Sequence, residues 1–199
     1  MKIGIMGGAF DPIHIGHLIA ADSAREQCGL DEVWFIPTAE SPLKHGAPGA
    51  NAAQRFEMVQ AAIDGHPAFR ALDLELKRGG VSYSYDTVSE LRERYPGYEF
   101  SYVIGSDRVH DLAQWHRIGE LAEIAGFIGL ERPDEPLRTD SLPVFLQQRL
   151  HLAEMPALGI SSTAIRRRLA AGRTIRYLVP DNVYLYIRRH MPYGSTRDD

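Results

Sequence analysis

Two histidines close to the N-terminus have the types and the spacing that phosphoryl chemistry requires. His14 and His17 end the segment MGGAFDPIHIGH, which covers residues 6–17 and follows a short apolar run. On the first turn of a helix, residues three apart share one face, and the unpaired N–H groups there attract phosphate. Glycines such as Gly7 and Gly8 let the backbone approach a ligand and adopt positive φ. The segment therefore indicates phosphoryl or nucleotidyl transfer.

The commoner phosphate-binding motifs do not match this segment. The dinucleotide fingerprint G-x-G-x-x-G needs a spacing that Gly4, Gly7 and Gly8 do not have, and no G-K-[ST] triplet of a P-loop follows. The form G-x-F-D-P-x-H-x-G-H instead resembles the nucleotidyltransferase superfamily with the H-x-G-H signature. That superfamily transfers nucleotidyl groups from nucleoside triphosphates and includes the class I tRNA synthetases.

Further polar residues stand where strands end or helices begin. Gly105 and Asp107 follow a strand-like run, where glycine permits close approach and Asp107 would either bind a nucleoside or cap a helix. Trp115 is either a core residue or a flat surface for an aromatic ligand. The segment SYSYDT at 82–87 precedes a helix, and its residues alone indicate no more than helix capping.

A hydroxyl-rich segment opens a helix late in the chain. Ser161, Ser162 and Thr163 can cap that helix, and its first N–H groups can meet phosphate. Helical spacing places Arg166 on the same face as Ser162 and Thr163, while the next two arginines point elsewhere. The hydroxyl-rich start favours a binding role for Arg166 over a generic basic surface.

The elements that position these residues follow from hydrophobic periodicity. Strands are predicted over 3–6, 33–36, 71–76, 100–104 and 125–130, and helices from 18 onward and over 53–63, 85–95, 161–171 and 180–190. Strands that alternate with helices favour right-handed βαβ units and a mostly parallel sheet. Ligands of such sheets bind beyond the carboxyl ends of the strands, so the loops after 3–6 and after 100–104 are the candidate site.

Length and charge bound the remaining possibilities. The 199 residues suffice for one domain, which we expect over 1–191, with a flexible tail over 192–199. The net charge of -4 provides no electrostatic argument for a nucleic-acid partner. The only cysteine, Cys28, excludes an internal disulfide, and no leader or membrane-length apolar stretch is visible. We expect a cytoplasmic protein without a nucleic-acid or membrane partner; a homo-oligomer is compatible with the sequence, which does not define the oligomeric state.

Taken together, the motifs resemble one family. GGAFDPIHIGHL, SPLKHG, SYSYDT, YVIGSD, WHRI, GISSTAIRRRL and IRYLVPDNVYLYI occur in this order from the first strand to the last helix. The set is similar to that of the bacterial nicotinate-nucleotide adenylyltransferases over nearly the whole chain. The resemblance implies a single-domain, Rossmann-like α/β fold of the nucleotidyltransferase type. It also implies transfer of AMP from ATP to nicotinic acid mononucleotide, with Mg²⁺, to give deamido-NAD and pyrophosphate in NAD biosynthesis.

The resemblance also implies roles position by position. The catalytic residues would be His14, His17 and Arg166. ATP would be bound by Gly7, Gly8, Ala9, Phe10, Gly105, Asp107, Ser161, Ser162 and Thr163. The acceptor would be bound by Lys44, Ser84, Tyr85, Asp86, Thr87 and Trp115, with N–H groups around 84–86 meeting its carboxylate and the indole stacking on its ring. No residue is expected to ligate a metal, because Mg²⁺ would be held mainly by the ATP phosphates and water.

The chain departs from the family pattern at two places. Many members have Thr or Ser where this chain has Ala9, and many have two prolines and a histidine before the lysine, where this chain reads SPLK up to Lys44. Three alternatives remain open from the sequence. They are a small adenylyltransferase for nicotinamide mononucleotide or phosphopantetheine, a fragment of a class I tRNA synthetase, and a non-catalytic nucleotide-binding module.

Overall fold

The computed structural model describes residues 1–40, 49–131, 137 and 139–194. Its centre is a six-stranded sheet in the order β3-β2-β1-β4-β5-β6, and every neighbouring pair is parallel. The strands are β1 (Lys2–Gly8), β2 (Glu32–Pro37), β3 (Phe69–Ala71), β4 (Glu99–Gly105), β5 (Gly126–Glu131) and β6 (Leu150–Glu154). The predicted parallel α/β sheet is confirmed.

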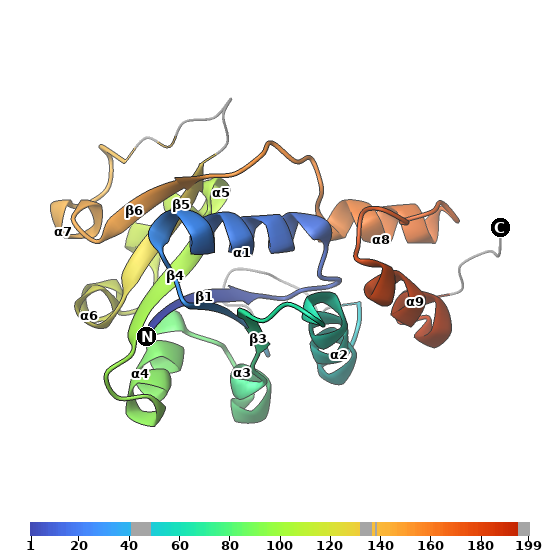
Figure 1. Cartoon of the computed structure of the whole chain (residues 1–199), viewed down its shortest axis with the longest axis horizontal. Helices are drawn as coiled ribbons and strands as arrows, with labels where there is room; N and C mark the ends of the chain where they lie inside the picture. The colour runs from blue at the N-terminus through green and yellow to red at the C-terminus, as the bar shows by residue number, and fades with distance from the viewer. Residues whose placement is uncertain (41–48, 132–136, 138, 195–199) are drawn as a thin grey trace.

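Helices cover both faces of the sheet, as Figure 1 shows with α1 above it and α3 and α4 below. One apolar core lies under α1 (Ile15–Cys28), α2 (Ala52–Ile63), α8 (Ser162–Ala170) and α9 (Asp181–His190). The other lies under α3 (Leu74–Arg78), α4 (Ser84–Arg94), α6 (Ile118–Ile124) and α7 (Val144–Gln147). The short α5 (Ser106–Val109) and the 3-10 turn η1 (Leu112–Gln114) follow β4.

The strands read as continuous apolar runs because both of their faces are buried. In β2, Val33 and Phe35 enter the first core, whereas Trp34 and Ile36 enter the second. All four side chains are fully buried. This alternation fixes the register of the central strands, since a slip by one residue would exchange the two cores.

The strand order reverses beside β1, which pairs with β2 on one side and β4 on the other. Ligands of doubly wound sheets bind in the crevice beyond the carboxyl ends of the strands at this switch point. The loops after β1 and β4 both open there, as the sequence predicted. At the same end, α8 and α9 lie together on the right of Figure 1.

The prediction of a strand over 71–76 is wrong. β3 ends at Ala71, and α3 begins at Leu74. Alternating Leu72 and Leu74 suggested a strand, but a short apolar run does not separate helix from strand by its period. The tertiary structure adds a contact that the local pattern does not contain: Glu75 is buried and accepts a hydrogen bond from Thr87 of α4 at 2.6 Å.

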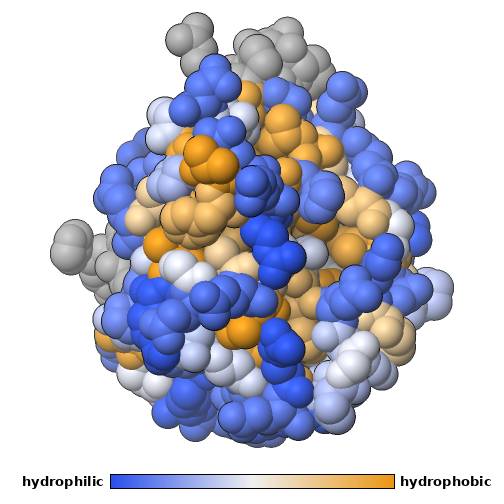
Figure 2. Space-filling model, turned by 90° about the vertical axis from the view of Figure 1, so that its left-hand side faces the viewer, coloured by the Kyte–Doolittle hydropathy of each residue, from blue (hydrophilic) through white to orange (hydrophobic). Residues whose placement is uncertain are grey.

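Among the described residues, no helix is long and apolar enough to cross a bilayer. Figure 2 shows the face that carries α6 and α7, on which hydrophobic side chains form small areas separated by hydrophilic ones. Apolar side chains scattered in this way are normal for a protein surface.

Candidate active site

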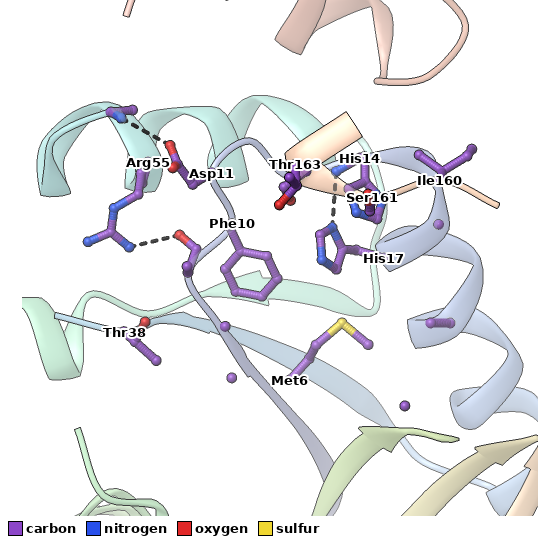
Figure 3. Close-up of a pocket in the computed structure, with 18 of the residues that line it drawn as sticks. Met6, Phe10, Asp11, His14, His17, Thr38, Arg55, Ile160, Ser161 and Thr163 are labelled. Atoms are coloured by element: carbon purple, nitrogen blue, oxygen red, sulfur yellow. Dashed lines mark hydrogen bonds between the residues drawn. The ribbon is translucent and has the colours of Figure 1, made fainter. Parts of the chain in front are cut away.

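A cleft of about 1360 Å³ opens at the switch point of the sheet. The loops after β1 and β4 and the starts of α1, α2 and α8 form its walls (Figure 3). Of the residues expected to bind ATP or to act in catalysis, the following line it: Gly7, Gly8, Ala9, Phe10, His14, His17, Gly105, Ser161, Ser162, Thr163 and Arg166. Tertiary folding thus brings together two segments that lie about 150 residues apart.

Gly7 and Gly8 end β1 without the positive φ that was expected, and only Gly7 is closely approached by a side chain. A Cβ on Gly7 would lie 2.8 Å from the hydroxyl oxygen of Tyr102, so a side chain there would displace that ring. Positive φ occurs instead at Phe10, at 49°. The Phe10 ring is buried and packs edge-on against His17, with ring centroids 5.1 Å apart. The Phe10 ring therefore packs against one side of the His17 ring.

The two histidines stack on each other at the start of α1. His14 is the cap residue of the helix, and its ring centroid lies 3.6 Å from that of His17, so the prediction that they share a face is confirmed. The backbone N–H of His14 donates to Nδ1 of His17 at 3.1 Å (Figure 3). Because Nδ1 accepts in this bond, the ring hydrogen of neutral His17 is at Nε2.

Because it is buried, His14 has a lower pKa than an ordinary surface histidine. The residue is 7% exposed, and desolvation lowers its pKa from 6.5 to about 4. Its Nδ1 atom has no hydrogen-bond partner within the described residues. His14 is therefore neutral at pH 7, and its unpaired polar atom is suited to a ligand in the cleft.

The start of α8 closes the other side of the cleft. Ser161 caps the helix by accepting from the N–H of Ala164 at 3.2 Å, which confirms the predicted cap. The Ser162 hydroxyl donates to the carbonyl of Pro12 at 2.9 Å and ties α8 to the first loop. Arg166 reaches back over the same turn, with Nη2 3.5 Å from Oγ1 of Thr163.

Sequence reasoning missed two buried charged residues at the site. Asp11 is 5% exposed, and its carboxylate accepts from the N–H groups of Gly49 and Ala50 at 2.8 and 3.0 Å. Arg55 of α2 is 2% exposed, and Nη1 donates to the carbonyl of Ala9 at 2.8 Å. Burial lowers the pKa of Arg55, and the negative charge of Asp11 opposes that shift. Asp11 had a signal, an acid between apolar Phe10 and Pro12, whereas Arg55 had none, because charged helical residues are usually exposed.

The predicted acceptor residues that the structure describes, Ser84, Tyr85, Asp86, Thr87 and Trp115, do not line the cleft. Trp115 is half-buried and meets Tyr102 edge-on, with centroids 5.5 Å apart. Tyr102 also lies beside Ser84 and approaches Gly7 at the end of β1. One aromatic side chain therefore separates the acceptor residues from the phosphate loop.

The start of α4 is the polar part of this second region. Ser84, Tyr85 and Asp86 are its first three residues, whose N–H groups have no partner within the helix. The cap residue Tyr83 makes no side-chain hydrogen bond to them. Thr87 differs, because its fully buried hydroxyl donates to Glu75 and accepts from Nη2 of Arg78 at 2.8 Å. Thr87 therefore holds α4 against α3 through its hydroxyl, and its predicted role in acceptor binding stays a prediction.

Two of the predicted site residues have no described side chain. Lys44 lies outside the described residues, and of Asp107 only the place in α5 is described. Within the described part of the chain, no group of three or more His, Cys, Asp or Glu side chains could hold a metal ion. Among the described residues of the cleft lining, the acids are Asp11 and Glu40, and protein donors occupy the oxygens of Asp11.

Comparison with known proteins gives a consistent result. The family model of cytidylyltransferase-like proteins matches residues 5–168. A relative from Oceanobacillus iheyensis, named "Probable nicotinate-nucleotide adenylyltransferase", is 47% identical over 197 residues, with 99% of each chain covered. A relative of the same name from Bacillus pumilus is 43% identical over 194 residues, covering 98% of this chain and 99% of its own.

Solved structures agree at the level of the fold. The Plasmodium falciparum nicotinic acid mononucleotide adenylyltransferase complexed with NaAD superposes with a TM-score of 0.78 at 23% identity. The match covers 96% of this chain and 97% of that chain. The whole architecture is therefore shared, including the end of the sheet at which the cleft opens.

Proposed function

The chain belongs to the nicotinate-nucleotide adenylyltransferases, within the cytidylyltransferase-like family, and we infer from this that it transfers AMP from ATP to nicotinic acid mononucleotide. The products are deamido-NAD and pyrophosphate, in NAD biosynthesis. The observation that carries the assignment of the site is the meeting of His14, His17 and Arg166 across one cleft. These three side chains place hydrogen-bond donors from both ends of the chain around a space large enough for a nucleotide.

The reaction needs no nucleophile from the enzyme. A phosphate oxygen of the mononucleotide attacks the α-phosphorus of ATP, a new P–O bond forms, and the bond to pyrophosphate breaks. The protein must hold two polyanions in line and stabilise the charge that develops. We assign that stabilisation to Nε2–H of His17, to the guanidinium of Arg166, and to the N–H groups at the start of α8.

Neutral His14 and charged Arg166 have different tasks in this scheme. His14 can donate one hydrogen bond without adding charge, because burial keeps its pKa at about 4. Arg166 keeps its charge and presents its fork of donors to phosphate oxygens. The apolar lining near Val103, Leu130 and Met155 is suited to the adenine ring. Gly105 leaves space there for close approach of the nucleoside.

We place the acceptor at the start of α4, beside Trp115. The N–H groups of Ser84, Tyr85 and Asp86 are donors at a positive helix end, which suits a carboxylate. A carboxamide would turn its own NH₂ donors toward at least one of these groups and leave polar atoms unpaired. The arrangement therefore favours nicotinic acid mononucleotide over the amide.

Mg²⁺ is the proposed cofactor, held by ATP phosphates and water. The occupied oxygens of Asp11 and the absence of an acid cluster among the described residues fit a metal that brings its ligands with the nucleotide. When bound, the ion would offset phosphate charge. We also propose a cytoplasmic location, which the single cysteine favours.

A pyrophosphate-release assay with a panel of acceptors tests the function. With ATP fixed, kcat/KM for nicotinic acid mononucleotide should exceed that for nicotinamide mononucleotide by at least about 10²-fold, below the 10⁴–10⁵-fold ceiling of such sites. Phosphopantetheine should give no release above the rate without acceptor. Comparable efficiencies with acid and amide would assign dual specificity, and turnover with phosphopantetheine alone would assign another adenylyltransferase. Nucleotide binding without any turnover would indicate a binding module.

A further inference from the structure

A buried carboxylate behind the cleft joins four separate parts of the chain. Asp11 accepts from Gly49 and Ala50 at the start of α2, from the Tyr193 hydroxyl at 2.8 Å, and lies 3.4 Å from Nη1 of Arg166. Figure 3 shows it turned toward the start of α2. Because protein donors occupy both of its oxygens, Asp11 does not serve as a ligand for substrate. Its effect on the reaction must pass through its partners.

Arg166 is the partner that faces the cleft. Its Nη1 donates to the backbone carbonyl of Asp11 at 2.6 Å as well as approaching the carboxylate. The side chain is 35% exposed, so the rest of the guanidinium remains accessible from the cleft. An arginine side chain that is already held in place loses less rotamer entropy when it binds a ligand than a free one does. Asp11 holds one edge of this arginine before the nucleotide arrives.

The Tyr193 hydroxyl is a further donor to the Asp11 carboxylate, and it comes from the far end of the sequence, 182 residues away. Its ring occupies the space left by Gly49, where a Cβ would lie 3.0 Å from Cδ1 and 3.1 Å from Cε1. Burial and the neighbouring Asp11 raise the pKa of Tyr193, so the hydroxyl stays protonated and donates at neutral pH. This contact lies inside the predicted tail; residues 195–199 are outside the described residues, and the flexible tail there stays a prediction.

We propose that Tyr193 is a positioning residue for the nucleotide site, which acts by holding the Asp11 carboxylate that orients Arg166. The inference rests on the proposed function, in which Arg166 contacts ATP phosphates. Without the hydroxyl, Asp11 loses one hydrogen-bond donor, and its carboxylate shifts relative to Arg166 and to the N–H groups at the start of α2. Arg166 then binds the ATP phosphates more weakly, whereas the acceptor region at the start of α4 does not change.

The test is Tyr193→Phe, with Tyr186→Phe as its matched control. Tyr186 also donates to a carboxylate, that of Glu57 at 2.5 Å, from the same C-terminal part of the chain, but Glu57, unlike Asp11, lies outside the cleft lining. Tyr193→Phe should raise the KM and Kd for ATP about tenfold, the scale of one charge-assisted hydrogen bond. The KM for nicotinic acid mononucleotide should change less than twofold. The control should leave both constants unchanged.

A double-mutant cycle separates positioning from general support. In an Arg166→Ala background, Tyr193→Phe should change the Kd for ATP less than twofold, because the residue through which it acts is gone. A full tenfold effect in that background, or no effect in the wild-type background, overturns the proposal. Chains that end at Met191 and at Gly194 repeat the comparison by truncation, since only the longer one keeps Tyr193. If the wild-type enzyme released no pyrophosphate, the proposed function would fail, yet ATP binding by calorimetry would still decide the role of Tyr193.

Discussion

At the scale of single residues, two identical side chains acquire different properties from their surroundings. His14 is buried, keeps a lowered pKa of about 4 and has an unpaired Nδ1. His17 accepts a hydrogen bond from the backbone of His14 and rests on Phe10, so its Nε2–H is fixed in direction. A donor whose direction is fixed before the reaction needs no reorganisation when negative charge develops. Such preorganised donors contribute most to stabilising the transition state.

His17→Ala should lower kcat by roughly 10²–10³, the usual effect of losing one donor to a developing charge. His17→Asn should lose as much, although its amide oxygen can still accept from the N–H of His14. Initial rates of pyrophosphate release at saturating substrates measure both variants. His151→Ala, on the exposed side of β6, is the matched control and should keep wild-type kcat. Near-normal turnover of His17→Ala would remove this residue from the mechanism.

At the scale of elements, the site consists of helix starts arranged around strand ends. Ser161 caps α8, His14 caps α1, and the start of α4 presents its first N–H groups without a side-chain cap. Trp115 ends η1 beside α4, with its Nε1 buried and unpaired within the described residues. The half-buried indole, turned edge-on to Tyr102, keeps part of its surface for a ligand ring.

Trp115→Ala should weaken acceptor binding by about 1–3 kcal/mol, the scale of one base stacked on an aromatic side chain. The KM for ATP should change little, because the indole is outside the cleft lining. Acceptor KM and the thermal midpoint, measured on the same preparation, separate stacking from packing.

Trp34→Phe is the control, since Trp34 is fully buried in the core. It should lower the midpoint without a selective change in acceptor KM. If Trp115→Ala instead lost about 3–5 kcal/mol of stability and kept its acceptor KM, the indole would be a packing residue.

At the scale of the whole molecule, the buried His14 couples function to acid stability. Its pKa is about 4 in the folded chain and near 6.5 when unfolded, so between these values the unfolded chain binds more protons. The stability that this residue contributes is complete above pH 6.5 and is lost as the pH falls toward 4. At about 1.4 kcal/mol per pH unit, the loss reaches about 3 kcal/mol.

Urea unfolding at pH 7.5, 6.0 and 4.5 measures this effect as the difference between wild type and His14→Gln. The difference isolates His14 from the other groups, among which Glu75 acts in the opposite sense because burial raises its pKa. The wild-type free energy of unfolding should fall more steeply than that of His14→Gln below pH 6.5. Parallel pH profiles for the two proteins would show that His14 is solvated in solution.

The local pattern of this sequence was sufficient for β1, β2, β4 and β5, for the five longest helices and for the two loops that form the cleft, but it did not predict β6 and it misplaced β3. Continuous apolar runs, caps such as Ser161 and the spacing of His14 and His17 are properties of neighbouring residues. Carboxyl ends of parallel strands meet at one edge, so the loops could be placed together before any coordinates were known. The H-x-G-H segment predicted nucleotidyl transfer, again because its residues are neighbours in the sequence.

Only the tertiary structure decided the contacts between distant residues. The hydrogen bond of Asp11 with Tyr193 spans 182 positions, and that of Arg55 with Ala9 spans 46. In the segment 71–76, α3 begins at Leu74, and Glu75 accepts a hydrogen bond from Thr87, twelve residues ahead. Such pairs leave no local period or cap in the sequence, because a buried charge becomes favourable only when folding brings its donors to it.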